Sequence, residues 1–326
     1  MSGPEIVAGD IGGTNARFAI ARLADDGSIA LSDERKLKVA DHASFESAWE
    51  TFAAGLGRPV PDAAAIAVAG PVGGERISLT NNPWSLVPAT LRQTLGLKDL
   101  LFVNDFAAVA SAVAVLPPEH FAHIAGPDTG LPAAGPITVM GPGTGLGVAI
   151  LSRVPGARPR VIPTEGGHVD FAPLDSVEDR ILAELRRQFR RTSVERIVAG
   201  PGLVNIHAAL AAIEGRLFQP MADDRLWQKV AEGEDGLVRT AFERWCMSLG
   251  SVAGDMALAH GAVAVVLGGG ILPRIAGRLP ATGFHDRFKA KGRFETRMAG
   301  LPIRRITHPE PGLLGAAAAF LVGERQ

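Results

Sequence analysis

Two glycine-rich turns, each flanked by apolar runs of strand character, constrain the fold of this chain most. The first turn, Gly9-Asp10-Ile11-Gly12-Gly13-Thr14, lies between the runs 6–8 and 17–23. The second, 141–147, lies between the runs 137–140 and 148–151. Each pattern predicts a strand, a turn and a second strand, whereas the common nucleotide-binding motifs continue into a helix. We therefore expect two similar α/β halves, each beginning with a hairpin.

The length and composition agree with a two-domain globular protein. The chain has 39 glycines among 326 residues, about 12% compared with roughly 7% in average proteins. Its 47% hydrophobic and 21% charged residues can form a large core. Repeated Pro and Gly residues in 117–136 predict a domain boundary near residue 116. The expected smaller α/β domain comprises 1–115 with 306–326, and the larger comprises 116–305.

Charge and cysteine content exclude several classes of protein. The net charge of -1 provides no overall field for a polyanion, so we expect no nucleic-acid partner. Cys246 is the only cysteine, which rules out a disulfide scaffold and fits a cytoplasmic protein. The first ten residues do not resemble a signal peptide. The most apolar run, 261–272, is too short to span a membrane, so no membrane partner is expected.

Both glycine turns have the composition of phosphate-binding loops. Glycines let backbone N–H groups approach phosphate oxygens, but the carboxylate of Asp10 would repel phosphate unless a divalent cation lay between them. An ordinary hairpin with an Asx turn explains the first turn equally well when it is taken alone. Glycines at alternating positions in the second turn weaken a strand, which favours a ligand close to the backbone. Gly268-Gly269-Gly270 follows the predicted strand 263–267 and could lie beside a base or ribose, or form a plain turn.

Polar residues follow a buried strand at 100–103. Asn104 and Asp105 lie at its carboxyl end, where open α/β sheets bind ligands. An amide and a carboxylate suit adjacent hydroxyl groups, and the carboxylate can accept a proton. The pair therefore indicates a polyol substrate. The alternative is that Asp105 only caps the predicted helix 106–115.

Two further segments carry candidate ligands. Glu165-Gly166-Gly167-His168 places an acceptor and a donor in one turn, which suits hydroxyl groups but also a simple surface turn. Glu195 follows Thr192 by three residues and matches a helix capping box. Helical spacing of apolar residues in 176–196 and 237–259 predicts helices there, and 313–322 is predicted as a C-terminal helix.

Taken together, these segments resemble the bacterial glucokinase family of the hexokinase, actin and Hsp70 ATPase superfamily. The resemblance implies an α/β, two-domain actin-like ATPase (ribonuclease H-like) fold with a cleft between the domains. The related repressor-ORF-kinase branch carries a cysteine-rich zinc motif, which a chain with one cysteine cannot supply. The segments that carry the resemblance are Gly9 to Arg17, Thr80-Asn81-Asn82, Asn104-Asp105-Phe106, 141–147, 163–168, 194–196 with 200–205, and 267–273.

The resemblance implies a role for each candidate residue. Asp105 would act as general base, and Asp10 would contact Mg²⁺ directly or through water. The implied roles of Asp105 as general base and of Glu195 as a glucose ligand replace the interpretation of each as a helix cap. The implied glucose ligands are Asn104, Asp105, Glu165, His168 and Glu195. The implied ATP-binding residues are Gly9, Asp10, Ile11, Gly12, Gly13, Thr14, Gly141, Gly143, Thr144 and Gly145, with Gly268, Gly269 and Gly270 beside the adenosine.

The implied activity is MgATP-dependent phosphorylation of D-glucose to glucose 6-phosphate, and a homodimer is expected. A kinase for another hexose, such as N-acetylglucosamine or mannose, could use the same hydroxyl-binding residues. An actin-like ATPase without sugar transfer is a further alternative, although it would not need the second polar cluster of Glu165, His168 and Glu195.

Overall fold

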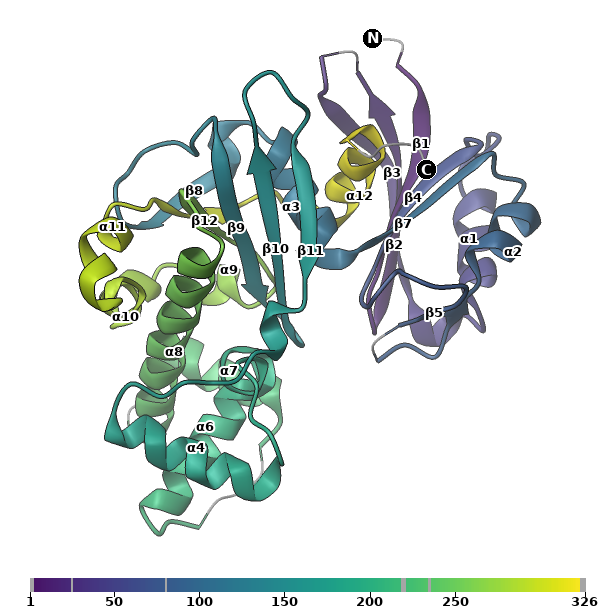
Figure 1. Ribbon diagram of the computed structural model, residues 1–326. Helices are drawn as coiled ribbons and strands as arrows, with labels where there is room; N and C mark the ends of the chain where they lie inside the picture. The colour runs from purple at the N-terminus through teal and green to yellow at the C-terminus, as the bar shows by residue number, and fades with distance from the viewer. Residues whose placement is uncertain (1–2, 25, 80, 218–220, 234–235, 323–326) are drawn as a thin grey trace. The chain divides into compact units, whose positions relative to one another are not determined.

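The computed structural model describes residues 3–24, 26–79, 81–217, 221–233 and 236–322 (Figure 1). Thr80, one of the residues that carried the resemblance, lies outside them. The chain forms two compact units. Unit 1 consists of 1–120, 156–163 and 307–326, and unit 2 consists of 121–155 and 164–306.

A five-stranded sheet forms the centre of unit 1. Its strand order is β3-β2-β1-β4-β7, in which β1, β4 and β7 are parallel and the hairpin strands β2 and β3 are antiparallel. The strands are β1 (Glu5–Ile11), β2 (Asn15–Leu23), β3 (Ile29–Lys38), β4 (Ala63–Val68) and β7 (Asp99–Asn104), with a small separate hairpin of β5 (Ile77–Ser78) and β6 (Ser85–Leu86). The helices are α1 (Phe45–Ala54), α2 (Pro88–Thr94), α3 (Asp105–Val115) and α12 (Pro311–Val322). The predicted first hairpin and C-terminal helix are therefore confirmed.

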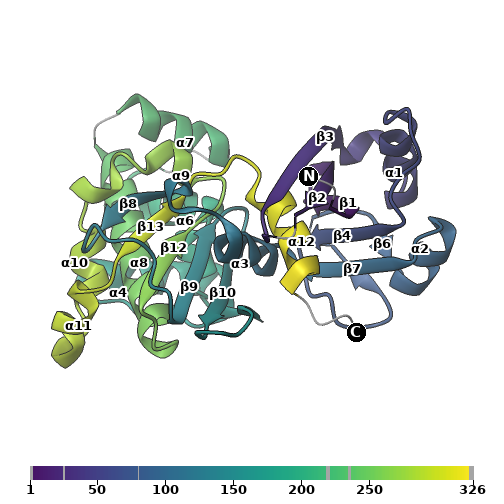
Figure 2. The same ribbon diagram turned by 90° about the horizontal axis from the view of Figure 1, so that it is seen from above.

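Helices cover both faces of this sheet. Successive side chains of a strand point to opposite faces, and here both faces are apolar and must be buried. In Figure 2, α1 and α12 lie on opposite sides of the sheet. Val7 and Ile11 of β1 belong to the core that contains α1, whereas Ile6 and Ala8 belong to the core that contains α12. Alanines of β4 make the second face flat. Small residues also let α12 approach α3 closely, since a Cβ at Gly315 would lie 1.8 Å from the Ala108 carbonyl oxygen.

A six-stranded sheet in the order β11-β10-β9-β12-β13-β8 lies in unit 2, except for most of its edge strand β11, which falls in the segment 156–163 of unit 1. Its strands are β8 (Phe121–Ala125), β9 (Gly135–Pro142), β10 (Leu146–Arg153), β11 (Arg160–Thr164), β12 (Ala264–Leu267) and β13 (Ile303–Ile306). β9 and β10 form an antiparallel hairpin around the second glycine turn, as the sequence predicts. β12 runs parallel to β9 on its other side, so the end of β12 lies beside that turn.

The helical part of unit 2 packs around α8 (Leu237–Ala259), the long green helix in Figure 1. Its Trp245 is fully buried and donates a hydrogen bond to the Ala199 carbonyl oxygen over 3.1 Å. Trp227 donates to the Gly200 carbonyl oxygen over 3.1 Å. These bonds fix the start of α6. The other helices are α4 (Ser176–Gln188), α5 (Glu195–Val198), α6 (Gly200–Ile213), α7 (Asp223–Glu232), α9 (Leu272–Ile275), α10 (Phe284–Lys289) and α11 (Glu295–Ala299).

The helix expected in 176–196 is interrupted. Asp175 caps α4 by accepting from the N–H groups of Val177 and Glu178, and α4 ends at Gln188. Phe189 is extended, and the backbone of 192–194 bonds to 169–171 before α5 begins. Helical spacing of apolar residues did not reveal this interruption because the backbone groups of 192–194 find partners outside the helix.

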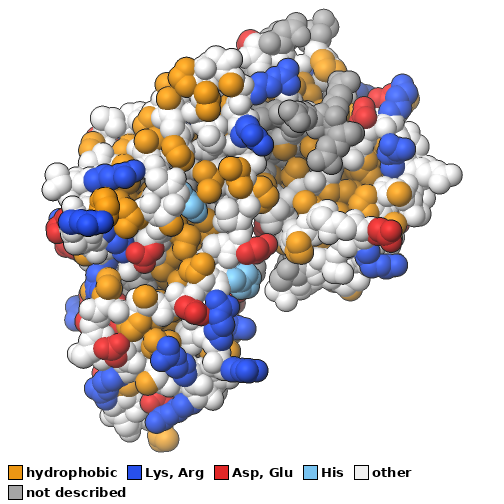
Figure 3. All heavy atoms as spheres, viewed as in Figure 1, with side chains coloured by type: hydrophobic (Ala, Val, Ile, Leu, Met, Phe, Trp, Pro, Cys, Tyr) orange, Lys and Arg blue, Asp and Glu red, His pale blue; other side chains and the backbone are white. Residues whose placement is uncertain are grey.

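Among the described residues, no helix is both long enough and apolar enough to cross a bilayer. Charged side chains of both signs are interspersed on the face shown in Figure 3. This distribution agrees with the near-zero net charge.

Candidate functional site

The first glycine turn is held by a pair of asparagines. The Gly12 N–H donates to the Asn15 carbonyl oxygen over 3.0 Å, and the Asn82 side chain donates to the Gly12 carbonyl oxygen over 2.8 Å. Asn81 has a positive φ of 56°, and a Cβ at Gly13 would lie 2.8 Å from its carbonyl oxygen. Apart from the family resemblance, no local pattern in the sequence points to Asn81 and Asn82. In the structure, both asparagines contact the backbone of the turn and so fix its conformation.

Asp10 lies at the end of β1 in a partly buried charged cluster. Arg17, its partner in the β1–β2 register, places Nη1 3.5 Å from Asp10 Oδ2. Arg17 Nε lies 3.2 Å from Glu310 Oε2. Burial raises the pKa of Asp10 to about 6, opposed by the Arg17 charge and reinforced by Glu310. Ionising Asp10 is therefore costly in the free protein, and a nearby cation would relieve that cost.

The chemistry of Asp10 fits a magnesium ion that is held mainly by another molecule. A carboxylate oxygen is a ligand that Mg²⁺ prefers, and Mg²⁺ in phosphate sites is often held by only one or two carboxylates. In the described part of the chain, no three His, Cys, Asp or Glu side chains converge on a possible metal position. Asp10 fits the group as a single carboxylate ligand, with the remaining ligands supplied by phosphate and water.

Not every residue of the first predicted phosphate loop lies in the turn. Gly9 and Ile11 are inside β1 and buried. A Cβ at Gly9 would lie 2.6 Å from Ile66 Cδ1, so a side chain there would force Ile66 to shift. Gly12, Gly13 and Thr14 form the turn itself, and Thr14 is exposed.

The second turn is built by contacts among glycines from three separate segments of unit 2. The Gly143 N–H donates to the Gly145 carbonyl oxygen over 2.8 Å, and the Gly200 N–H donates to the Gly143 carbonyl oxygen over 2.8 Å. Gly269 has a φ of 94°, and a Cβ there would lie 2.4 Å from the Pro142 carbonyl oxygen. The predicted phosphate loop 141–147 and the predicted adenosine segment 268–270 therefore touch each other. Thr144 is exposed at the tip of the turn.

Glu195 supports this turn with its carboxylate. Its Oε2 accepts a hydrogen bond from the Leu146 N–H over 3.1 Å, and a Cβ at Gly145 would lie 2.5 Å from the same oxygen. The capping-box interpretation is not realised, since α5 begins after Val194 and the buried Thr192 hydroxyl has no hydrogen-bond partner among the described residues. The Glu195 carboxylate therefore contacts the second turn and does not complete a capping box.

The turn of Glu165 to His168 lies against Leu146, the residue whose N–H binds Glu195. A Cβ at Gly167 would be 2.2 Å from the Leu146 carbonyl oxygen, so only glycine permits this approach. Glu165 Oε2 and His168 Nε2 are 3.9 Å apart, and both side chains are exposed. Leu146 thus has Glu195 on its N–H and the 165–168 turn on its carbonyl. Both segments that carry the candidate hydroxyl ligands of unit 2 therefore lie against Leu146 of the second turn.

Asn104, and not Asp105, caps α3. The Asn104 side-chain oxygen accepts from Phe106 and Ala107 N–H groups over 3.0 and 3.1 Å, and its amide donates to the Gly70 carbonyl oxygen over 3.3 Å. Asp105 is the first residue of α3 and is half-buried, and its Oδ1 accepts from the Phe106 N–H over 2.9 Å. The cap is therefore supplied without Asp105.

Asn104 also lies at the same sheet edge as the first turn. Across the parallel strands, Ile11 is in register with Val68, and Val68 is in register with Asn104. This is the carboxyl edge of β1, β4 and β7, the usual ligand-binding edge of such a sheet. Unit 1 therefore holds Asn104, Asp105 and the first turn, whereas unit 2 holds Glu165, His168, Glu195 and the second turn.

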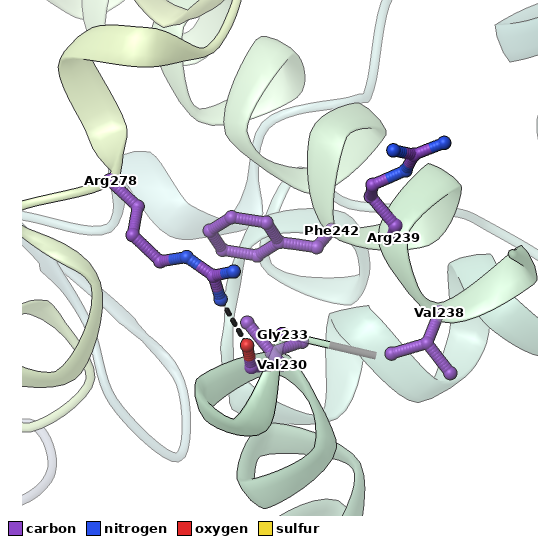
Figure 4. A pocket seen from close by; sticks show the side chains of 6 residues that line it. All are labelled: Val230, Gly233, Val238, Arg239, Phe242 and Arg278. Carbon is purple, nitrogen blue, oxygen red and sulfur yellow. Dashed lines mark hydrogen bonds between the residues drawn. The ribbon is translucent and has the colours of Figure 1, made fainter. Parts of the chain in front are cut away.

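A small cavity of about 30 Å³ lies elsewhere in unit 2, where the Arg278 guanidinium points at the Val230 carbonyl oxygen and donates to it (Figure 4). Its volume is close to that of one water molecule, too small for a sugar or nucleotide. None of the candidate site residues lines it. The lining residues are Val230, Gly233, Val238, Arg239, Phe242 and Arg278.

The arrangement of turns and ligands can be compared with known proteins. The family model for glucokinase matches residues 7–322. The chain is 57% identical over 316 residues to a glucokinase of Zymomonas mobilis subsp. mobilis, which covers 97% of each chain. The chain belongs to the glucokinase family.

Solved structures agree with this membership of the glucokinase family. A glucokinase from an Antarctic psychrotroph superimposes with a TM-score of 0.87 at 32% identity, over 99% of this chain and 100% of that chain. A ROK family glucokinase from Streptomyces griseus in complex with glucose and AMPPNP gives a TM-score of 0.61 at 18% identity, over 96% and 98%. The second likeness shows the fold alone. The predicted two-domain, actin-like α/β fold is confirmed.

Proposed function

We propose that this member of the glucokinase family transfers the γ-phosphoryl group of MgATP to the 6-hydroxyl of D-glucose. The observation that carries the proposal is the position of Leu146 in unit 2. Its N–H binds Glu195, and its carbonyl lies against the 165–168 turn. One backbone segment therefore joins a phosphate-type turn to three side chains suited to sugar hydroxyls.

In the proposed reaction, Asp105 orients the 6-hydroxyl and accepts its proton. The hydroxyl oxygen forms a bond to the γ-phosphorus while the bond from that phosphorus to the bridging oxygen breaks, and ADP leaves with the electron pair. Glu165, His168 and Glu195 bind the other hydroxyls, and Asn104 presents Asp105 by fixing the start of α3. Such positioning accounts for most of catalysis when the transition state is loose.

The two glycine turns would bind the phosphates through backbone N–H groups and the hydroxyls of Thr14 and Thr144. Magnesium, when bound, neutralises charge on the phosphates. Asp10 would hold it from the end of β1, directly or through water. Gly268 to Gly270 would lie beside the adenosine, because Gly269 approaches the backbone of the second turn.

Further properties complete the proposal. We expect a cytoplasmic homodimer that uses ATP and Mg²⁺ in the first step of glucose metabolism. We expect domains of 1–115 with 306–326 and of 116–305, limits that differ from the two compact units at 116–120, 156–163 and residue 306. Light scattering of the purified protein tests the homodimer, and proteolysis with and without ligands tests the domain limits.

The activity is tested by coupling glucose 6-phosphate formation to NADP⁺ reduction. We expect glucose to be phosphorylated with a higher kcat/KM than mannose or N-acetylglucosamine. A preference for either of those sugars would favour another hexose kinase. The Asp105→Ala variant should lose nearly all transfer while part of its glucose binding survives, because the general base is removed and the other ligands stay.

A matched control separates the role of Asp105 from general effects of charge. Asp99 is an exposed aspartate at the opposite end of the same strand, β7. Asp99→Ala should keep normal turnover. Near-normal turnover in Asp105→Ala would remove Asp105 from the mechanism without affecting the assignment of the substrate.

A further inference from the structure

A short ladder joins the two sugar-binding segments of unit 2. The Phe171 N–H donates to the Thr192 carbonyl oxygen over 3.0 Å, and the Val194 N–H donates to the Val169 carbonyl oxygen over 2.9 Å. Asp170 and Ser193 pair between these bonds. The ladder begins directly after the 165–168 turn and ends directly before Glu195. It therefore sets the distance between the turn and Glu195.

Arg191 lies beyond the Phe171–Thr192 end of this ladder, and its side chain reaches back toward the turn. Its Nη2 donates to the His168 carbonyl oxygen over 2.5 Å, and its Nε lies 2.6 Å from Asp170 Oδ1. A guanidinium can hold both acceptors at once because its donors lie in one plane at fixed angles. Arg191 thus grips the last residue of the turn from the segment that leads into Glu195.

We propose that Arg191 is a positioning residue for the sugar, which it does not touch. It fixes the backbone of His168 relative to Glu195, so that the ligands in unit 2 are arranged before glucose arrives. The inference rests on the proposed function of these ligands. Preorganisation of this kind improves substrate binding because less ordering remains to be done on association.

The exposure of Arg191 separates positioning from folding. The side chain is 58% exposed and that of Asp170 is 74% exposed. Exposed ion pairs contribute little to the stability of a fold. Removing Arg191 should therefore leave the thermal midpoint almost unchanged, and a change in glucose binding would reflect the local arrangement of the turn.

The kinetic test compares Arg191→Ala, Arg191→Lys and Arg190→Ala. Arg190 is the exposed neighbouring arginine and serves as the matched control. Arg191→Ala should raise the KM for glucose by about threefold to tenfold, the effect expected of one hydrogen bond. The KM for MgATP and kcat should change less than about twofold. Arg191→Lys, which keeps the charge but not the planar donors, should fall between wild type and Arg191→Ala.

A second measurement does not depend on activity. In hydrogen exchange followed by mass spectrometry, Arg191→Ala should exchange faster than wild type in the peptide that covers 165–171, whereas Arg190→Ala should not. If wild type makes no glucose 6-phosphate, the proposed function fails, and this measurement still tests whether Arg191 holds the 165–168 turn. An unchanged glucose KM, an equal effect of Arg190→Ala, or unchanged exchange in 165–171 would overturn the proposal.

Discussion

The two glycine hairpins have similar strand patterns but are supported in different ways. The first turn, at β1–β2, is supported by polar side chains, namely the Asn82 amide and the Asp10, Arg17 and Glu310 charges. The second turn, at β9–β10, is supported by backbone contacts from Gly200 and Gly269 and by one carboxylate, that of Glu195. Charged side chains surround the first turn, whereas close backbone contacts of glycines surround the second.

This difference indicates a division of labour. The first turn has a carboxylate that is costly to ionise, so it is suited to respond to a metal-bound phosphate. The second turn is connected through Leu146 to the candidate sugar ligands, so it is suited to align the phosphate with the acceptor. Substitutions in the first turn should therefore act mainly through charge, and substitutions in the second mainly through fit.

Among substitutions at the two turns, the largest effect is expected for Asp10→Asn. Removing the carboxylate next to the proposed metal should lower kcat by about a hundredfold to a thousandfold, as the loss of one strong electrostatic contact does elsewhere. Steady-state kinetics at saturating MgATP measures it. Asp41→Asn, at an exposed position of unit 1, is the control. Full turnover in Asp10→Asn would show that charge at the first turn is not required.

The same variant should be more stable than wild type at neutral pH. Because the pKa of Asp10 is raised to about 6 from an ordinary value of 3.8, the wild type loses stability as pH rises through this interval. Without nucleotide, Asp10→Asn should gain about 1 to 3 kcal/mol at pH 7.5, and the gain should be about 1 kcal/mol smaller at pH 5.0. Urea unfolding at both pH values measures it. A gain that grows toward low pH would contradict the assigned shift.

A smaller effect is expected at the second turn for Gly145→Ala. The new Cβ would lie 2.5 Å from Glu195 Oε2 and displace the carboxylate from Leu146. We expect kcat/KM for glucose and for MgATP to fall about tenfold together, in line with the cost of overpacking. Gly277→Ala, where the added Cβ meets nothing within 4 Å, should behave like wild type. A loss confined to MgATP would separate the turn from the sugar ligands.

The smallest effect is expected for Asn82 variants. Asn82→Ala loses the donor to the Gly12 carbonyl oxygen and the acceptor for the Trp84 N–H, at 2.8 and 2.9 Å. The KM for MgATP should rise about threefold to tenfold, the worth of one or two hydrogen bonds. Asn82→Asp keeps the acceptor but not the donor, so a KM equal to that of Asn82→Ala would attribute the effect to Gly12. A wild-type KM in both variants would show that the first turn does not need the hydrogen bond from Asn82 to Gly12.

The sequence was sufficient to predict both hairpins, the helix at 237–259 and the C-terminal helix, because their patterns are local. It did not predict the break between Gln188 and Glu195, since the partners of 192–194 lie in 169–171. Such partners are distant in sequence and leave no periodic signal nearby.

The candidate site follows the same rule. Glycines and paired polar residues marked the turns, and the family resemblance assigned Glu195 its proposed role as a sugar ligand. The contacts of Leu146, Arg17 and Arg191 could not be predicted. An arginine that pairs across a hairpin or holds a carbonyl looks, in the sequence, like any exposed arginine.

If the two turns and the sugar ligands serve one transfer reaction, phosphoryl transfer from MgATP requires the sugar. The most direct measurement is ³¹P NMR of the purified protein with MgATP, first without and then with glucose. We expect almost no ADP without the sugar, and one glucose 6-phosphate for each ADP once glucose is added. ADP formed at the same rate without glucose, with no sugar phosphate, would contradict it.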